Sequence, residues 1–180
     1  MIRSASSTLP ARRTAGVGLA QGVIDTPLGA LTALANEAGL MGLWFDSQQH
    51  GPGLLEAPLD NDQRWIAQAR DELDRYFAGR LREFQVKLAP QGTPFQEAVW
   101  RRLCTIRCGE TTSYGRIARD VGSPQASRAV GAAVGRNPLS IVVPCHRVLG
   151  TDGSLTGYAG GLQRKSALLQ LEGALMTAAH

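Results

Sequence analysis

Two short helical patterns joined by a tight turn place the strongest constraint on the fold of this chain. The first covers residues 111–122 and carries an apolar stripe, and the second covers residues 125–135. Gly122-Ser123-Pro124 separates them, and Asn137-Pro138 ends the second, because proline cannot continue a helix. The pattern predicts a helix-turn-helix, which binds DNA in many proteins but also occurs in helical hairpins that never touch nucleic acid.

The second of these helices is rich in small residues. They are Ala126, Ala129, Gly131, Ala132, Ala133 and Gly135. Helices that read bases in the major groove carry Asn, Gln and Arg instead. Each glycine costs a helix about 1 kcal/mol, so some neighbour should need close access to this backbone. That neighbour is either another helix or the minor groove of DNA. Arg128, Ser127 and the free amides of the first turn suit contact with phosphate, which leads to the hypothesis of DNA binding without sequence preference.

Charge is unevenly divided between the two halves of the chain. The 180 residues carry a net charge of +4. Residues 1–93 hold nine Lys and Arg against ten Asp and Glu, whereas residues 94–180 hold ten against five. The basic second half favours a polyanionic partner, although a solvated charged face is the commoner explanation when charge is the only evidence.

Composition also bears on the cellular compartment. With 43% apolar residues, the chain can fold as one domain or as two small ones with a shared core. It contains no transmembrane run, and residues 1–22 lack the continuous apolar core of a signal peptide. Cys104, Cys108 and Cys145 are an odd number of cysteines without an export signal. We therefore expect free thiols, a cytoplasmic protein and no membrane association.

The first half is predicted to be a small α+β unit. Its expected segments are a disordered leader (1–21), a strand-like stretch (22–29), two hairpin strands (30–36 and 40–45), an exposed loop (48–59), a helix from Asp60 or Asn61 as N-cap to about Ala78, a short strand (84–88) and a linker (89–92). Residues 22–89 contain no cluster of catalytic residue types. We therefore interpret this unit as structural.

The second half opens with a strong helix signal. Thr93 is a good N-cap, Pro94 suits the first helical position, and apolar residues at helical spacing extend the predicted helix to about Arg107. Cys104 and Cys108 lie four residues apart and could face one metal ion. Such a site would need two further ligands, so thiols in the core or at its boundary are the better interpretation, and we predict no metal.

A cysteine with unusual neighbours follows the helix-turn-helix. The apolar run Ile141-Val142-Val143 is long enough for a buried strand, and it leads through Pro144 into Cys145-His146-Arg147-Val148. A thiol beside titratable and cationic groups suits nucleophilic chemistry, while the alternative is a core cysteine that happens to precede polar residues. Adjacent side chains on an extended strand point to opposite faces, so direct contact between Cys145 and His146 is not expected.

Several motifs in the second half, in this order and spacing, resemble the O6-alkylguanine-DNA alkyltransferases, also called methylated-DNA-protein-cysteine methyltransferases. The matching residues are Arg128-Ala129-Val130-Gly131, Asn137-Pro138, Pro144-Cys145-His146-Arg147-Val148, Gly157-Tyr158-Ala159-Gly160-Gly161, Lys165 and Glu172-Gly173. The resemblance covers residues 93–173, followed by a tail at 174–180, and is loose for the first half. It implies an α+β protein with a ribonuclease-H-like N-terminal domain at 22–89 and a helical C-terminal domain with a winged helix-turn-helix.

The resemblance implies direct repair of DNA. In this family the alkyl group of O6-alkylguanine, and also of O4-alkylthymine, moves irreversibly to a cysteine of the protein, here Cys145, without a cofactor and without turnover. The thiol must lose its proton, and the family is described with a water between Cys145 and His146 and with Glu172 fixing the imidazole tautomer. Asn137, Tyr158 and Lys165 complete the implied catalytic set.

The same resemblance implies how the lesion is reached. The damaged base is rotated out of a duplex bound through its minor groove, at a cost of a few kcal/mol. Arg128 fills the gap in the stack and Tyr114 crowds the adjacent phosphate. The implied residue sets are Ser127, Ala126, Ala129, Gly131, Arg128 and Tyr114 for DNA, and Val148, Tyr158, Ala159, Gly160 and Tyr114 for the extruded base. A monomer is expected, with cooperative binding along DNA left open.

Two features depart from well-studied relatives. Ala159 stands where they carry a serine that bonds the guanine edge, and His50 is the one candidate zinc ligand in the first half, so no zinc is expected.

Two other functions are alternatives to alkyl transfer. A non-catalytic binder of alkylated DNA would lack the cysteine that is present here. A cysteine hydrolase would need a histidine base other than the adjacent one.

Overall fold

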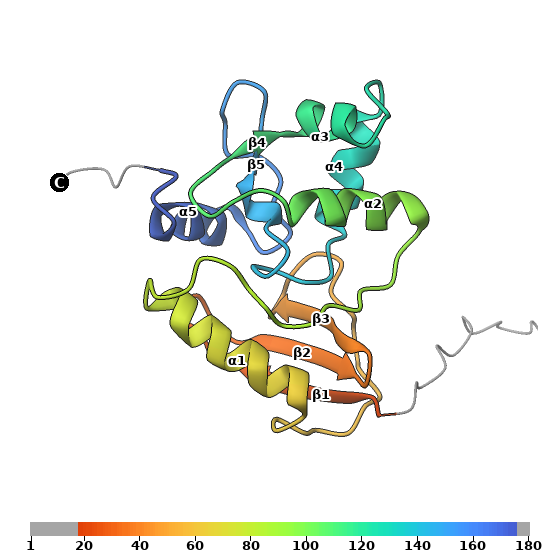
Figure 1. Ribbon diagram of the computed structural model, residues 1–180, viewed down its shortest axis with the longest axis vertical. Helices are drawn as coiled ribbons and strands as arrows, with labels where there is room; N and C mark the ends of the chain where they lie inside the picture. Colours follow the sequence, from red (N-terminus) through yellow and green to blue (C-terminus); the bar gives the residue numbers. More distant parts are fainter. Residues whose placement is uncertain (1–17, 176–180) are drawn as a thin grey trace, which may run out of the picture.

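The N-terminal half of the computed structural model, which describes residues 18–175, is a three-stranded antiparallel sheet covered by one helix (Figure 1). Strands β1 (Ala20–Ile24), β2 (Leu31–Asn36) and β3 (Gly39–Phe45) lie in the order β1-β2-β3. Every second residue of β2 is buried, and helix α1 (Arg64–Phe77) packs against all three strands. The predicted hairpin is confirmed. Strand β1 starts at Ala20, two residues before the expected start of the first unit, and residues 1–17 of the predicted leader lie outside the described residues.

Two details of the predicted N-terminal elements are wrong. The N-cap of α1 is Gln63, whose side-chain oxygen accepts hydrogen bonds from the backbone N–H groups of Trp65 (2.8 Å) and Ile66 (3.2 Å), and not Asp60 or Asn61. Residues 84–88 form no strand, although Leu88 makes an isolated bridge to Leu40. The buried carboxylate of Glu72 accepts from the N–H groups of residues 85 and 86, so these groups are not available to a ladder.

The C-terminal half is mainly helical and lies against the first (Figure 1). Its elements are α2 (Pro94–Leu103), β4 (Thr112–Ser113), α3 (Tyr114–Asp120), α4 (Ser127–Gly135), the 3₁₀ turn η1 (Cys145–Arg147), β5 (Val148–Leu149) and α5 (Leu162–Leu171). The predicted cap of α2 is confirmed, because Thr93 and Gln96 form a reciprocal capping box. Helix α2 ends at Leu103, four residues earlier than expected, and turns follow it to Glu110.

The predicted helix-turn-helix is present as α3 and α4. Helix α3 is preceded by the short strand β4, and α4 begins at Ser127, two residues later than expected. Strand β4 pairs in parallel with β5, and this small sheet leads into the loop 150–161 beside the helices. The predicted α+β fold class is confirmed, and the arrangement is consistent with a winged helix-turn-helix.

The predicted strand before Cys145 is wrong. Residues 140–143 form turns and a bend, with Ile141 in the left-handed region at φ 71°; before them Leu139 makes an isolated bridge to Leu43, and after them Val148 and Leu149 form β5. The run is nevertheless buried. Its backbone groups bond to a side chain and to each other, since the Asn137 amide donates to the Leu139 and Val143 carbonyls and accepts from the Leu139 N–H. An apolar run therefore signalled burial correctly but not the backbone conformation.

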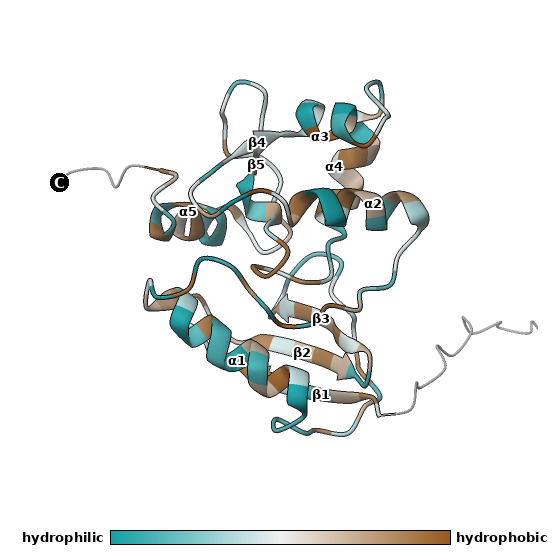
Figure 2. Cartoon of the chain, viewed as in Figure 1, coloured by the Kyte–Doolittle hydropathy of each residue, from teal (hydrophilic) through white to brown (hydrophobic). Residues whose placement is uncertain are grey.

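The two halves share one continuous core. Buried side chains of the sheet, α1, α2, α4 and the segment around Cys145 belong to a single cluster, and Figure 2 shows hydrophobic residues on the strands and on most of α4. Residues 138–140 pair with the middle of β3: the Leu43 N–H donates to the Pro138 carbonyl (2.7 Å), and the Ser140 N–H donates to the Leu43 carbonyl (2.9 Å). The segment that carries Cys145 is thereby attached to the N-terminal sheet.

A search for membrane-spanning segments in residues 18–175 finds no helix with the length and apolar character to cross a bilayer.

Candidate active site

Cys145 begins the 3₁₀ turn η1 and is 5% exposed. Asn137, which follows α4, places its side-chain amide nitrogen 3.0 Å from the Cys145 sulfur and 2.8 Å from the Val143 carbonyl oxygen. Burial raises the pKa of the Cys145 thiol to about 11, although the Asn137 hydrogen bond and the charge of Lys165 act in the opposite direction. The resting cysteine is therefore a thiol, and a base must take its proton before it can act as a nucleophile.

His146 is fully buried behind the cysteine. Its Nε2 atom lies 2.9 Å from the Glu172 Oε1 atom, while its Nδ1 atom is buried without a hydrogen-bond partner among the described residues. Burial lowers the pKa of His146, and Glu172 offsets part of that effect. An ionised carboxylate can only accept, so Nε2 carries the proton and Nδ1 keeps the lone pair of a base.

As the sequence predicted, Cys145 and His146 are not hydrogen-bonded to each other, but the physical reason differs. Both residues lie in a 3₁₀ turn, so the argument from opposite faces of a strand does not apply. Within residues 18–175, no direct hydrogen bond joins the two side chains, and the free Nδ1 atom is the one suited to receive a proton through a water.

Glu172 follows α5 and is the centre of a buried polar cluster. Its side chain is fully buried and accepts from His146, from Arg147 through Nε and Nη2 (both 2.8 Å), and from the Tyr76 hydroxyl (2.8 Å). Burial alone would raise the pKa of Glu172, but the hydrogen bonds and charges of His146 and Arg147 hold it well below its usual range. From sequence alone a surface position was the commoner expectation for this carboxylate, and the structure places it in the core.

Lys165 and Tyr158 are buried close enough to Cys145 to interact with it electrostatically. The Lys165 ammonium is buried and donates to the carbonyls of Val148 (2.5 Å) and Thr156 (2.6 Å). Burial lowers the pKa of Lys165 to about 8, an effect that Cys145 partly offsets. The Tyr158 hydroxyl is buried without a hydrogen-bond partner in the described chain, and burial and then Cys145 raise its pKa well above the usual value. A buried unpaired hydroxyl is ready to bond an incoming group.

The loop that would face a substrate is held by residues from both halves. The Tyr114 hydroxyl donates to the Thr156 and Gly157 carbonyls, both at 3.2 Å, and the Gln49 N–H donates to the Ala159 carbonyl at 3.0 Å. A Cβ atom at Gly160 would come within 2.7 Å of the Tyr158 ring and 3.1 Å of Phe45, so only glycine fits there. The structure thus brings Tyr114, Tyr158, Ala159 and Gly160 around one loop.

Helix α4 leaves most of its small residues at least partly exposed, with Ala133 buried. Ser127, Arg128 and Ala129 are exposed, Ala126 and Gly131 are partly exposed, and Val130 and Val134 point into the core. A Cβ atom at Gly131 would make an ordinary contact of 3.9 Å with Tyr114, and one at Gly135 would meet nothing within 4 Å. Packing inside the protein therefore does not require either glycine.

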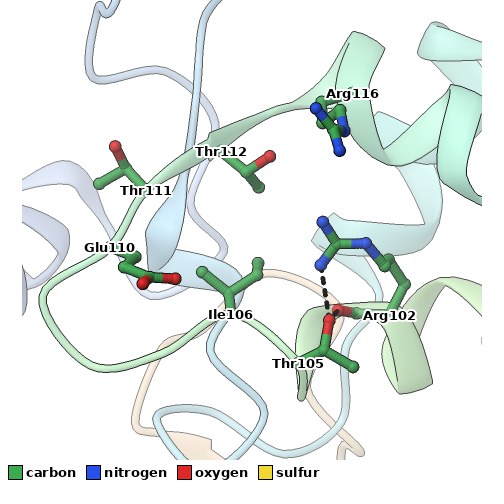
Figure 3. Close-up of a pocket in the computed structure, with 7 residues that line it drawn as sticks. All are labelled: Arg102, Thr105, Ile106, Glu110, Thr111, Thr112 and Arg116. Atoms are coloured by element: carbon green, nitrogen blue, oxygen red, sulfur yellow. Dashed lines mark hydrogen bonds between the residues drawn. The ribbon is translucent and has the colours of Figure 1, made fainter.

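A surface cavity of about 260 Å³ is not lined by Cys145 (Figure 3). It lies between the segment after α2 and the start of α3, and its arginines are already engaged: Arg102 (2.7 Å) and Arg116 (3.0 Å) both bond Asp120, and Arg102 also donates to Thr105. Burial would raise the pKa of Asp120, but the two arginines outweigh it and lower the pKa. This cavity is not the reacting site.

No group of three or more potential metal ligands of the His, Cys, Asp and Glu types occurs within residues 18–175. Cys104 is exposed and Cys108 is half-buried.

Two members of the polar cluster were missed by the sequence reasoning. Arg147 could have been included, because it directly follows Cys145-His146 at the end of an apolar run and a buried arginine requires an acidic partner. Tyr76 could not be identified from the sequence, because it occupies the buried face of α1 like its apolar neighbours and lies 96 residues from Glu172 in the chain. The interpretation of the first half as purely structural is therefore incomplete.

Comparisons with known proteins cover both halves of the chain. Residues 94–174 match the model of the 6-O-methylguanine DNA methyltransferase, DNA binding domain, and residues 19–90 match that of the 6-O-methylguanine DNA methyltransferase, ribonuclease-like domain. A methylated-DNA--protein-cysteine methyltransferase of Methanosarcina barkeri is 47% identical over 152 residues, covering 83% of this chain and 94% of the relative. One of Mycobacterium tuberculosis is 49% identical over 149 residues, covering 83% and 89%.

Solved structures agree. The crystal structure of Mycobacterium tuberculosis OGT in complex with DNA superimposes with a TM-score of 0.79 at 47% identity, covering 86% of this chain and 93% of that one. The structure described as Mycobacterium tuberculosis O6-methylguanine methyltransferase gives 0.78 at 46%, covering 89% and 96%. The family resemblance found in the motifs around Cys145 is confirmed, and the chain belongs to the 6-O-methylguanine DNA methyltransferase family.

Proposed function

We propose that this protein repairs DNA by transferring the alkyl group of O6-alkylguanine to its own Cys145, once and irreversibly. The observation that carries the proposal is the buried Cys145 thiol held by Asn137, with the ionised Glu172 and the neutral His146 directly behind it. Membership of the family and the names of relatives as methylated-DNA--protein-cysteine methyltransferases support the same activity.

The chemistry is one displacement. The sulfur–carbon bond forms as the carbon–O6 bond of the lesion breaks, which leaves a thioether on Cys145 and an unmodified guanine. The proton of the thiol moves through a water to His146 Nδ1, and Glu172 stabilises the imidazolium that results. A thioether has no leaving group that the site could expel, so the protein acts once.

The leaving guanine must be protonated as it departs. The buried and unpaired Tyr158 hydroxyl supports a role for it as the donor to the base. Lys165 donates to the Val148 carbonyl at 2.5 Å, and we assign this carbonyl as the acceptor for the exocyclic amine of guanine, because a carbonyl oxygen has two lone pairs. The methyl of Ala159 offers no hydrogen bond, so any contact to the base at this position comes from the backbone.

Access to the base requires that it be turned out of the duplex. We assign the binding surface to the exposed side of α4, where Arg128 projects from its first turn and the small residues allow the backbone to approach a minor groove. The complex of the Mycobacterium tuberculosis relative with DNA supports DNA as the partner. We further propose recognition without sequence preference, action as a monomer in the cytoplasm, and repair of O4-alkylthymine by the same route.

Incubation with duplex DNA carrying one O6-methylguanine, followed by mass spectrometry of the intact protein and of its peptides, tests the function. We expect one methyl group per protein, located on Cys145, together with loss of the lesion from the DNA. Tight binding with an intact lesion and no added mass would reject alkyl transfer and leave a binder of alkylated DNA.

A glycine on the DNA-facing helix provides a test of the binding surface. Gly131→Ala is expected to stabilise the protein by about 0.5–1 kcal/mol, because alanine is the better helix former and its Cβ fits beside Tyr114. The same methyl group should weaken binding to duplex DNA several-fold. Gly135→Ala is the matched control, with a similar gain in thermal stability and unchanged affinity. If Gly131→Ala bound DNA as tightly as wild type, α4 would not lie against the groove at this point.

A further inference from the structure

Tyr76 reaches the catalytic cluster from the other half of the molecule. It lies in the last turn of α1, is 2% exposed, and its hydroxyl donates to Glu172 Oε1 at 2.8 Å. Its ring packs against Phe77 and Phe84, each with centroids at 5.3 Å, so the side chain is fixed on both sides. The N-terminal half thus contributes a fixed hydrogen-bond donor to a carboxylate that contacts His146.

The two oxygens of Glu172 are not equivalent. Oε2 accepts from Arg147 Nε, whereas Oε1 accepts from His146 Nε2, Arg147 Nη2 and the Tyr76 hydroxyl. Arg147 is itself anchored, because its Nη1 donates to the Ile106 carbonyl at 2.5 Å. His146 therefore shares one carboxylate oxygen with two other donors. Each of them draws on the same electron density and limits how strongly Oε1 can stabilise an imidazolium.

Tyr76 is a permanent donor and takes no part in proton exchange. Burial, and then the adjacent Glu172 carboxylate, raise its pKa far above the usual value, so the hydroxyl keeps its proton at every working pH. Its contribution is orientation and polarisation of the carboxylate.

Resting on the alkyl transfer proposed above, we propose that Tyr76 is a positioning residue for that reaction. From the N-terminal half it fixes the orientation of Glu172 and sets how strongly this carboxylate supports protonation of His146.

The surroundings of His146 make the effect measurable. The charged and titratable groups around it are Glu172 and Lys165 from α5 and its end, Arg147 and Cys145 from η1, and Tyr158, whose ring meets the imidazole edge-on at 6.5 Å. Cys108 acts electrostatically on Tyr76 and Glu172 from the segment after α2. His146, Lys165 and the Glu172 side chain are all fully buried, so solvent screens the loss of one donor only weakly.

Tyr76→Phe removes one oxygen atom and keeps the ring, and it is the variant that tests the proposal. The single-turnover rate constant is expected to fall about fivefold, because Glu172 loses a donor that holds its orientation toward His146 and this loss outweighs the easier protonation of His146. The fall should be equal for methylated duplex and for the free base O6-benzylguanine, because Tyr76 does not contact DNA. With one fewer donor on Oε1, His146 gains a proton more easily. The loss of rate at acid pH should therefore begin at a higher pH than in wild type.

Phe77→Leu is the matched control, since it alters packing against the same ring and removes no donor. Its pH profile should follow that of wild type.

The double variant Tyr76→Phe/Glu172→Gln should react as slowly as Glu172→Gln alone, because Tyr76 acts through that carboxylate. Thermal unfolding verifies that each variant is folded at the assay temperature. An unchanged rate and acid limb in Tyr76→Phe, additive losses in the double variant, or the same shift in Phe77→Leu would each overturn the proposal. Absence of transfer by wild type in the same assay would instead overturn the proposed function on which it rests.

Discussion

Replacing Cys145 with alanine is expected to abolish alkyl transfer, because every other group in the site has at most a supporting role in the reaction. The affinity for duplex DNA is expected to stay within about twofold of wild type. The fold should tolerate the change. The lost sulfur is smaller than the groups whose removal costs about 0.5–1.5 kcal/mol in a core, and Asn137 keeps its bond to the Val143 carbonyl.

The measurement is transfer of label from DNA methylated at O6, scored as radioactivity bound to protein and as lesion remaining in DNA. Cys104→Ala, which removes an exposed thiol, is the control and should transfer normally. Label on the Cys145→Ala protein would show that another residue is the acceptor. Loss of DNA binding together with transfer would show that the thiol is needed for the fold of the binding surface.

Arg128→Ala should separate extrusion of the base from the chemistry on it. The Arg128 side chain is exposed on α4 and makes no hydrogen bond or ion pair within the described part of the chain, so its removal leaves the fold unchanged. If it fills the stack in place of the damaged base, its loss makes extrusion harder by a few kcal/mol, which corresponds to about a 100-fold slower reaction on duplex. Reaction with free O6-benzylguanine should stay within about twofold of wild type, because the free base needs no extrusion.

Arg136→Ala is the control for charge alone, since Arg136 is exposed just after the same helix. It should reduce affinity for DNA modestly and more at low salt, without the large loss of rate on bound duplex. Equal losses on duplex and free base for Arg128→Ala would remove the extrusion role from this residue and assign it to the active site or to stability.

The variants of Cys145, Arg128 and Tyr76 test which half of the chain contributes each part of the reaction. The C-terminal half contains Cys145 and α4, which we propose as the nucleophile and the DNA-facing helix, and residues of the N-terminal half hydrogen-bond to the segments around Cys145. Gln48 illustrates this second role. Its side-chain oxygen accepts from the Ser140 hydroxyl (2.7 Å) and from the Phe45 N–H (3.1 Å), while Arg164 lies over the Phe45 ring at 4.4 Å and donates to the Gly160 carbonyl. The loop before Cys145 and the loop that faces the substrate are thus both tied to the sheet.

Residues that act through local chemistry could be predicted from the sequence. The Thr93 cap, the helix-turn-helix around Ser123-Pro124 and the reactive setting of Cys145 depend on neighbours a few positions away, and the structure contains the first two where they were expected, within three residues. The strand predicted before Cys145 failed for a physical reason. Burial requires apolar side chains in any conformation, and here the Asn137 amide replaces the hydrogen bonds that a neighbouring strand would have supplied.

By itself the sequence determined the family and the class of fold, because these are written in short motifs with fixed spacing, and the same motifs predicted Cys145 as the nucleophile. Only the tertiary structure decided that Glu172 is buried, that Arg147 and Tyr76 share it with His146, and that α1 belongs to the site. The reason is that a buried carboxylate is stabilised by whichever donors the fold brings within about 3 Å of it. Tyr76 and Glu172 are 96 residues apart in the chain, and the packing of the two halves on one core brings them together. No local sequence pattern predicts such a contact.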